Sequence, residues 1–172
     1  MTIFLDGKKL SQNKRKQLKQ HVGLHCEKYA TPKLAAIIIG ADPASAIYVN
    51  NKIKACHDVG IESIVISKRS SLSQDNLLDI IDDLNNDNSI NGILVQLPLP
   101  SHIESQSIIE HIDPNKDVDG FHPYNIGRLA LRQPALRPCT PYGIMQLLEA
   151  YDLNPRGLNA TIIGVSNIVG RP

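Results

Sequence analysis

The chain has 172 residues, which suits one domain of ordinary size or one domain followed by the start of a second. Its 18 Lys and Arg residues against 17 Asp and Glu residues leave a net charge of +1, so no broad field attracts nucleic acid or an anionic membrane. The absence of Trp and the presence of only two Phe also argue against a platform for stacking nucleic-acid bases.

Targeting and redox signals are weak throughout the chain. Residues 1–8 contain no long apolar segment, and no stretch approaches the roughly 20 apolar residues that a membrane span needs. Cys26, Cys56 and Cys139 are odd in number, widely spaced and free of any Cys-x-x-Cys pair, so we expect reduced thiols rather than disulfides or zinc ligands. We therefore expect a cytoplasmic protein without a bound metal.

Strands and helices alternate along the first two thirds of the chain. Apolar or β-branched runs predict the strands, and helical spacing with capping residues predicts the helices. The predicted elements are a solvated helix over residues 10–29, a strand over 34–39, a helix over 44–59 closed by Gly60, a strand over 61–67, a helix from Ser73 to residue 85, a strand over 92–96 and a helix over 103–112. This order predicts an α/β fold with a three-layer parallel sheet, whose ligands bind beyond the carboxyl ends of the strands.

The last third of the chain is predicted to contain the start of a second domain. Residues 121–137 contain turn residues and three Arg and are predicted to be a loop that connects two domains. A helix over 142–151, a turn over 154–157 and a strand over 160–164 follow, and the strand runs into a glycine-rich segment. We therefore expect residues 1–123 to form one domain and residues 124–172 to be the connection and the incomplete start of a Rossmann-type dinucleotide-binding domain.

Tyr48 and Lys52 lie four residues apart on the predicted helix over 44–59 and therefore face the same way. An aromatic ring and an ammonium group could border one ligand pocket there. The alternative is a surface pair whose polar tips are solvated. A catalytic role would require Lys52 to be partly desolvated, so that it can exchange a proton near neutral pH.

Gln96 supplies an amide at the end of a predicted strand, and Asp119 supplies a carboxylate in a predicted loop. Gln96 ends a buried strand directly before a Leu-Pro-Leu-Pro turn, where it could bond Lys52 or a ligand, or simply satisfy the strand end. Asp119 lies in the Lys-Asp-Val-Asp-Gly sequence of residues 116–120, where it could accept hydrogen bonds from an amino-pyrimidine edge or form an Asx turn.

Three other patterns in the chain are poor matches to known sites. Residues 115–120 imitate the start of a calcium loop, but Ile126 stands where a bidentate Glu belongs. The Gly164-Val165-Ser166 sequence lacks the glycine of a nucleophile elbow and is better interpreted as a phosphate-binding turn. His21 and His25 have helical spacing for a metal but no third ligand, which indicates a solvated helix face.

Taken in order, these motifs resemble the bifunctional methylenetetrahydrofolate dehydrogenase/cyclohydrolase family of one-carbon metabolism. The resemblance rests on Gln-Leu-Pro-Leu-Pro at residues 96–100, Lys-Asp-Val-Asp-Gly at 116–120, Pro-Cys-Thr-Pro at 138–141 and the glycine-rich segment at 164–172. It implies an N-terminal catalytic domain that binds folate and a C-terminal Rossmann-type domain that binds NADP. It also implies a cytoplasmic homodimer formed through the Rossmann part, with a role in purine biosynthesis.

The resemblance further implies a role for each candidate residue. Lys52 is the central acid and base, Tyr48 stacks on and positions the pterin-bearing substrate, and Gln96 orients Lys52. Asp119 binds the pterin edge. The residues that touch the nicotinamide cofactor are Gly164, Val165 and Ser166. The implied chemistry is oxidation of 5,10-methylenetetrahydrofolate with NADP, then hydrolysis of the methenyl product to 10-formyltetrahydrofolate.

Two features set this chain apart from the family pattern. Many members have Arg or Ala at the position of Val165, and the Arg can hold the extra phosphate of NADP, so the preference between NADP and NAD stays open. Members also continue for about 100 further residues, so we expect this chain to lack a complete cofactor site. The alternative to an enzyme is a noncatalytic folate-binding or assembly module that uses the same cleft.

Overall fold

The computed structural model describes residues 4–172, apart from the side chain of Ala44. The chain divides into two compact units. One comprises residues 15–118, and the other joins residues 4–14 with residues 119–172. The first helix, α1 (Gly7–Cys26), has residues in both units. Just before it, and within the second unit, the Asp6 N–H donates to the Tyr151 hydroxyl at 2.8 Å.

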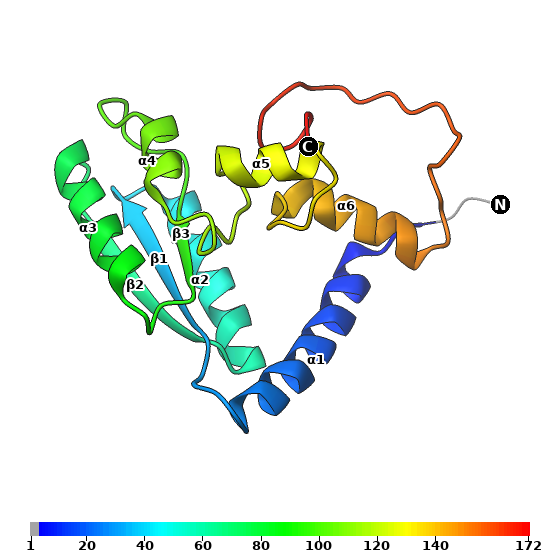
Figure 1. Cartoon of the computed structure of the whole chain (residues 1–172), viewed down its shortest axis with the longest axis horizontal. Coiled ribbons are helices and arrows are strands. Elements are labelled where there is room, and N and C mark those ends of the chain that lie inside the picture. The colour runs from blue at the N-terminus through cyan, green and yellow to red at the C-terminus, as the bar shows by residue number, and fades with distance from the viewer. Residues whose placement is uncertain (1–3) are drawn as a thin grey trace. The chain divides into compact units, whose positions relative to one another are not determined.

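A three-stranded parallel sheet forms the centre of the unit over residues 15–118 (Figure 1). Its strand order is β2-β1-β3, with β1 at Lys33–Ile39, β2 at Glu62–Lys68 and β3 at Gly92–Val95. The helices α2 (Pro43–Val59) and α3 (Gln74–Asn86) lie on opposite sides of the sheet, and α4 (Ser105–His111) joins the α3 side. The predicted three-layer α/β arrangement is confirmed.

The central strand β1 is covered on both faces because its alternate side chains enter two different cores. Ala35, Ile37 and Ile39 point to the α3 side, where they pack with Leu77 and Ile81 among other buried residues. On the opposite face a smaller core forms around the residues Ala36, Val49 and Leu94. A strand buried on both sides explains why residues 34–39 show an unbroken apolar run.

Both ends of α2 are capped, and the predicted end at Gly60 is confirmed. The Asp42 carboxylate accepts from the Ser45 N–H at 2.8 Å and from the Ser45 hydroxyl at 2.7 Å, and Pro43 occupies the first turn, where no N–H is needed. Gly60 ends the helix at φ 87°, a left-handed conformation that favours glycine. The short link from Ile39 to Pro43 therefore starts α2 at the carboxyl edge of the sheet.

The second unit corrects one prediction for the connecting segment. Residues 121–137 were expected to be a loop, but they contain α5 (Pro123–Ala130). The His122 side chain accepts from the Tyr124 N–H at 3.0 Å, and Pro123 supplies a preset first turn. The prediction was wrong because Pro and Gly were interpreted as turn residues, whereas Pro123 starts a helix and Gly127 lies within it.

The predicted helix near the C-terminal part is present as α6 (Cys139–Ala150), and it begins directly after Pro138. The predicted strand over residues 160–164 is wrong, because these residues have no regular structure. Ile162 is 71% exposed and Ile163 99% exposed. A strand needs a neighbour to complete its main-chain hydrogen bonds, and no strand within residues 4–172 pairs with this segment.

None of the helices in the described part of the chain is long and apolar enough to cross a membrane.

Helix α4 gives a testable dependence on pH. The Glu104 carboxylate caps this helix. Hydrogen bonds from Ser107, which have the larger effect, and from the Gln106 N–H lower the pKa of Glu104 below its ordinary value. Its contribution to stability is therefore complete above the ordinary pKa of a Glu carboxyl and is lost as the pH falls through the lower folded-state pKa. We expect Glu104→Gln to destabilise the protein at neutral pH, and the difference from the unsubstituted chain to shrink in acid.

Urea unfolding at a series of pH values measures this difference. Glu27→Gln, at an exposed position beyond α1, is the matched control and should show no such pH-dependent gap. If the free energies of unfolding of Glu104→Gln and the unsubstituted chain differed by the same amount at every pH, a charged cap would be contradicted.

Candidate functional site

Tyr48 and Lys52 lie on α2 beside the ridge that faces the sheet. Val49 is fully buried in the core on that side, and Ile53 packs against the same core. Lys52 is half-buried, whereas Tyr48 is 66% exposed. Because α2 starts at the carboxyl edge of the sheet, Tyr48 in its second turn lies near that edge. The helix thus presents an aromatic ring and an amine where ligands of parallel sheets bind.

Gln96 directly follows β3 at the same edge. Its N–H donates to the Ile37 carbonyl at 2.9 Å, which continues the pairing of β3 with β1 by one residue. Strand alternation places Gln96 on the same face as Leu94, which is the face that α2 covers. The Gln96 Nε2 donates to the Leu97 carbonyl at 2.6 Å, while its Oε1 is buried without a hydrogen-bond partner. An unpaired buried acceptor is costly, so it marks a position prepared for a donor.

The segment that follows Gln96 is stiff. The peptide bond between Leu97 and Pro98 is cis, and Pro100 follows two residues later. The Pro100 carbonyl accepts from the Ile103 N–H at 2.9 Å, which turns the chain toward α4. The rings of Pro98 and Pro100 each fix a backbone φ angle, so the segment that holds the end of β3 has few degrees of freedom.

Lys116 has a structural role that the sequence did not reveal. Its Nζ donates to the carbonyls of Leu84, Asn85 and Asp87 at 2.8 to 2.9 Å, so it caps the C-terminal end of α3. These carbonyls lack partners within a helix, and a cation there also complements the helix dipole. No local pattern in the sequence signals this contact, because Lys116 and α3 are about thirty residues apart.

The rest of the Lys-Asp-Val-Asp-Gly segment is built into the sheet. The Ile93 N–H donates to the Lys116 carbonyl at 2.7 Å, and Ile93 forms an isolated parallel bridge with Asp117, which is 2% exposed. Val118 packs over Gly92 so closely that a Cβ on this glycine would lie 2.4 Å from a Val118 methyl carbon. The segment is therefore a fixed extension of the β3 edge rather than a free loop.

Asp119 and Gly120 join the second unit, where they contact the Pro-Cys-Thr-Pro motif. The Asp119 carbonyl accepts from the Cys139 N–H at 3.3 Å. Gly120 has φ 73°, and a Cβ there would lie 2.3 Å from the main-chain carbon of Arg137. Two motifs that lie far apart in the sequence thus meet main chain to main chain, and Gly120 is required at the contact.

The glycine-rich segment closes on itself. Gly164 has φ 124°, and a Cβ on Gly170 would lie 2.1 Å from the Gly164 carbonyl oxygen. The Arg171 N–H donates to the Ser166 carbonyl at 3.1 Å, and the Gly170 N–H donates to the Ser166 hydroxyl at 3.4 Å. Val165 is 75% exposed. The segment forms a tight turn that presents Val165 and Ser166 outward, although no strand precedes it.

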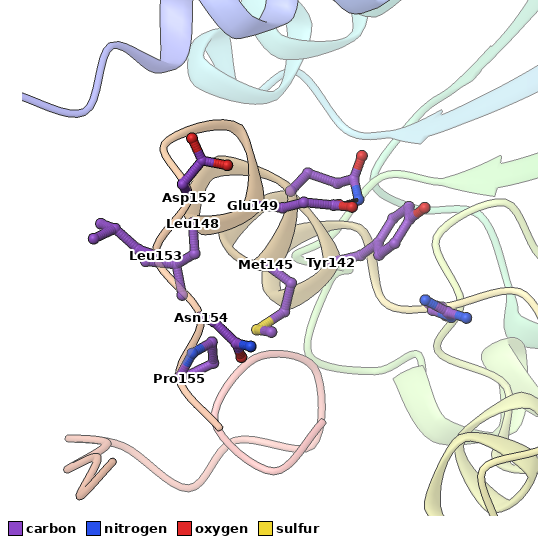
Figure 2. A pocket seen from close by; sticks show the side chains of 10 residues that line it. Tyr142, Met145, Leu148, Glu149, Asp152, Leu153, Asn154 and Pro155 are labelled. Carbon is purple, nitrogen blue, oxygen red and sulfur yellow. Dashed lines mark hydrogen bonds between the residues drawn. The ribbon is translucent and has the colours of Figure 1, made fainter. Parts of the chain in front are cut away.

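A hollow of about 470 Å³ runs along α6 (Figure 2). Met145 and Leu148 contribute apolar side chains to its lining, and Glu149 and Asp152 contribute carboxylates. None of the seven predicted site residues lines this hollow. It reflects the exposed face of α6, whose Tyr142, Ile144 and Met145 are 43 to 50% exposed.

The structure thus divides the predicted site residues into three places. Tyr48, Lys52 and Gln96 belong to the unit over residues 15–118, at the carboxyl edge of its sheet. Asp119 begins the second unit beside Pro-Cys-Thr-Pro, and the turn from Gly164 to Ser166 lies further along that unit. In the part of the chain that the structure describes, no group of three or more His, Cys, Asp or Glu residues is placed to hold a metal ion.

Comparison with known proteins identifies relatives along nearly the whole chain. The family described as tetrahydrofolate dehydrogenase/cyclohydrolase, catalytic domain, matches residues 5–119, and the NAD(P)-binding domain of the same family matches residues 138–172. The bifunctional protein FolD of Legionella pneumophila strain Corby is 55% identical over 98% of this chain and 60% of its own length. The chain therefore spans about 60% of the curated relatives that it matches.

Solved structures agree with this match. The bifunctional enzyme FolD, methylenetetrahydrofolate dehydrogenase/cyclohydrolase, from Campylobacter jejuni has a TM-score of 0.95 at 48% identity, over 97% of this chain and 60% of that one. The N5,N10-methylenetetrahydrofolate dehydrogenase-cyclohydrolase of Trypanosoma brucei, solved with NADP cofactor and inhibitor, has a TM-score of 0.95 at 31% identity, over 99% of this chain and 59% of that one.

The contact between the two motifs generates a prediction for Gly120. Gly120→Ala adds a methyl group at positive φ against the main chain of Arg137, so we expect the free energy of unfolding to fall by about 2 kcal/mol or more. Gly127→Ala makes the same change in α5, where a Cβ meets nothing within 4 Å, and should stabilise by about 0.5–1 kcal/mol. Chemical denaturation of both variants measures the difference, and equal effects would contradict the assigned contact.

Proposed function

Because the chain belongs to the tetrahydrofolate dehydrogenase/cyclohydrolase family, we propose that its full-length protein is a bifunctional enzyme of tetrahydrofolate one-carbon interconversion. Its dehydrogenase reaction oxidises 5,10-methylenetetrahydrofolate to the methenyl form with NADP. Its cyclohydrolase reaction adds water to the methenyl form and opens it to 10-formyltetrahydrofolate. The 55% identity to a bifunctional FolD protein over nearly the whole chain supports both activities.

Lys52, Gln96 and Tyr48 are the residues that we propose for catalysis and folate binding. One observation carries this proposal: the Gln96 Oε1 is a buried acceptor without a partner, at the sheet edge that α2 shares. The ammonium group of Lys52 is a donor of the right kind, so Gln96 can orient it. Lys52 is half-buried, and its amine is the kind of group that can give and take a proton during the addition of water.

Tyr48 and Asp119 complete the folate-binding set. The exposed ring of Tyr48 offers an apolar face on which a flat pterin can stack. The Asp119 carboxylate can accept hydrogen bonds from the amino and ring N–H groups of a pterin edge. The matched ranges support a folate-binding domain over residues 1–123, with residues 124–172 as the connection and the start of the NAD(P)-binding domain.

NADP is the proposed cofactor, and the turn from Gly164 to Ser166 is where it would be held. Gly164 and Gly170 keep side chains out of the interior of this turn, and Ser166 presents a hydroxyl beside exposed main chain, so the residues fit a dinucleotide. When bound, NADP accepts a hydride from the folate substrate. Val165 gives no positive charge for an extra phosphate, which leaves that recognition to other residues.

The remaining proposals concern the setting of the enzyme. We infer a cytoplasmic homodimer, formed in the full-length protein through the NAD(P)-binding domain, with a folate as its small-molecule partner. Neither nucleic acid nor a membrane is a proposed partner, in keeping with the net charge of +1. The product 10-formyltetrahydrofolate makes purine biosynthesis the proposed pathway.

Substitution of Lys52 tests the catalytic assignment in the full-length protein. We expect Lys52→Ala to lower the rate of methenyltetrahydrofolate hydrolysis by about 100-fold or more, because general acid and base catalysis typically contributes that much. Lys54→Ala, two residues further along the same helix and exposed, is the matched control and should keep the rate. The loss of methenyl absorbance over time measures the hydrolysis rate of both variants. An unchanged rate in Lys52→Ala would favour a noncatalytic folate-binding module.

The 172-residue chain itself should bind a folate at most. Residues 160–164 form no strand and Ile163 is almost fully exposed, so the glycine turn lacks the sheet that normally positions it. We expect little NADPH production from methylenetetrahydrofolate by the purified chain, as followed by NADPH absorbance. Turnover at rates typical of enzymes would contradict this view of the cofactor turn.

A further inference from the structure

The outer edge of β2 is an open strand edge. In the sheet that the structure describes, β2 pairs with β1 on one side, and its order β2-β1-β3 leaves the other side at the margin. Ile64 is 38% exposed and Val65 48% exposed, although both occupy the middle of the strand. Open edges with apolar side chains are templates for pairing with another strand.

The outward-facing main-chain groups of β2 can be assigned. The main-chain groups of Glu62 and Lys68 point inward, toward β1 and the residues that flank it. The Glu62 N–H donates to the Pro32 carbonyl and the Lys68 carbonyl accepts from the Gly40 N–H, each at 2.9 Å. Main-chain direction alternates along a strand, so Ser63, Val65 and Ser67 direct their N–H and C=O groups outward. The outward groups are therefore centred on Val65.

The residue types of β2 are also arranged symmetrically about Val65. The strand reads Glu-Ser-Ile-Val-Ile-Ser-Lys from Glu62 to Lys68. In an antiparallel pair centred on Val65, each Ser63 meets the Ser67 of the other copy, Val65 meets Val65, and each Glu62 meets Lys68. The residues whose main chains point outward are then opposite one another, which is the condition for exchanging N–H···O=C bonds.

We propose that β2 is a homotypic interface through which two copies of this chain pair antiparallel, edge to edge. The two sheets become one continuous sheet across a two-fold axis at Val65, with about six new main-chain hydrogen bonds. Ile64 and Val65 then gain apolar neighbours across the axis. This interface is independent of the proposed enzymatic function, and it lies on a different unit from the NAD(P)-binding segment.

Charge selects the antiparallel register. A parallel pair in register would place Glu62 on Glu62 and Lys68 on Lys68, which is unfavourable for like charges directly opposite. The antiparallel pair places opposite charges together at both ends of the strand. Glu62 already pairs with Lys33 of its own chain at 3.0 Å, so it would lie between two cations in the dimer.

Charge substitutions in the full 172-residue chain test the register. Lys68→Glu converts both cross-strand pairs to like charges, and Glu62→Lys does the same with the opposite sign. We expect either variant alone to raise the dimer dissociation constant about tenfold at low salt. An equimolar mixture of the two variants restores opposite charges at both ends and should dimerise again. Lys54→Glu, an equal charge change on the exposed side of α2, is the control and should leave the dimer unchanged.

Sedimentation equilibrium over a range of concentrations measures each dissociation constant, and circular dichroism checks that each variant is folded. Hydrogen exchange gives a second, positional readout. Dimerisation should protect the amides of Ser63, Val65 and Ser67 as concentration rises, while the inward amides of Ile64 and Ile66 are protected at every concentration.

Three results would overturn the proposal. The chain could remain monomeric at every concentration, the mixed variants could fail to dimerise although both are folded, or a dimer could form without protection of the three outward amides. A dimer through the second unit would produce the last result, with new protection within residues 119–172 instead of β2.

Discussion

Burial of β1 on both faces is the constraint on which the rest of the unit over residues 15–118 depends. One face of β1 enters the core with α3, and the other supports Val49 of α2. Both β1 and β3 end at the carboxyl edge of the sheet. The first turns of α2 and the side chain of Gln96 therefore lie at this edge, on the face of the sheet that α2 covers. Packing of the apolar core thereby positions Tyr48, Lys52 and Gln96, whose polar groups lie outside it.

The Lys-Asp-Val-Asp-Gly segment shows how one short motif can combine structural and functional residues. Lys116 holds the end of α3, Asp117 is buried beside β3, and Val118 fills the space over Gly92. Gly120 is required by the main chain of Arg137. Asp119 is the residue left for a ligand in our proposal, and the others fix the backbone that carries it.

The two errors of the sequence analysis have different physical causes. The segment over residues 121–137 was predicted to be a loop because it contains two Pro, one Gly and three Arg, yet Pro123 lies in the first turn of α5, which His122 caps. The segment over residues 160–164 has the composition of a strand but no partner strand within the described residues. Its composition is β-like, but a strand also depends on where its hydrogen-bonding neighbour lies.

Local spacing and ordered motifs are enough to predict the alternation of strands and helices, the end of α2 at Gly60 and the family. Three features emerge only in the folded chain: Lys116 caps α3, the Gln96 Oε1 is buried without a partner, and β2 lies at the sheet margin. Each of these depends on contacts or pairing between residues distant in the chain, and local residue preferences carry no information about which distant atoms will meet.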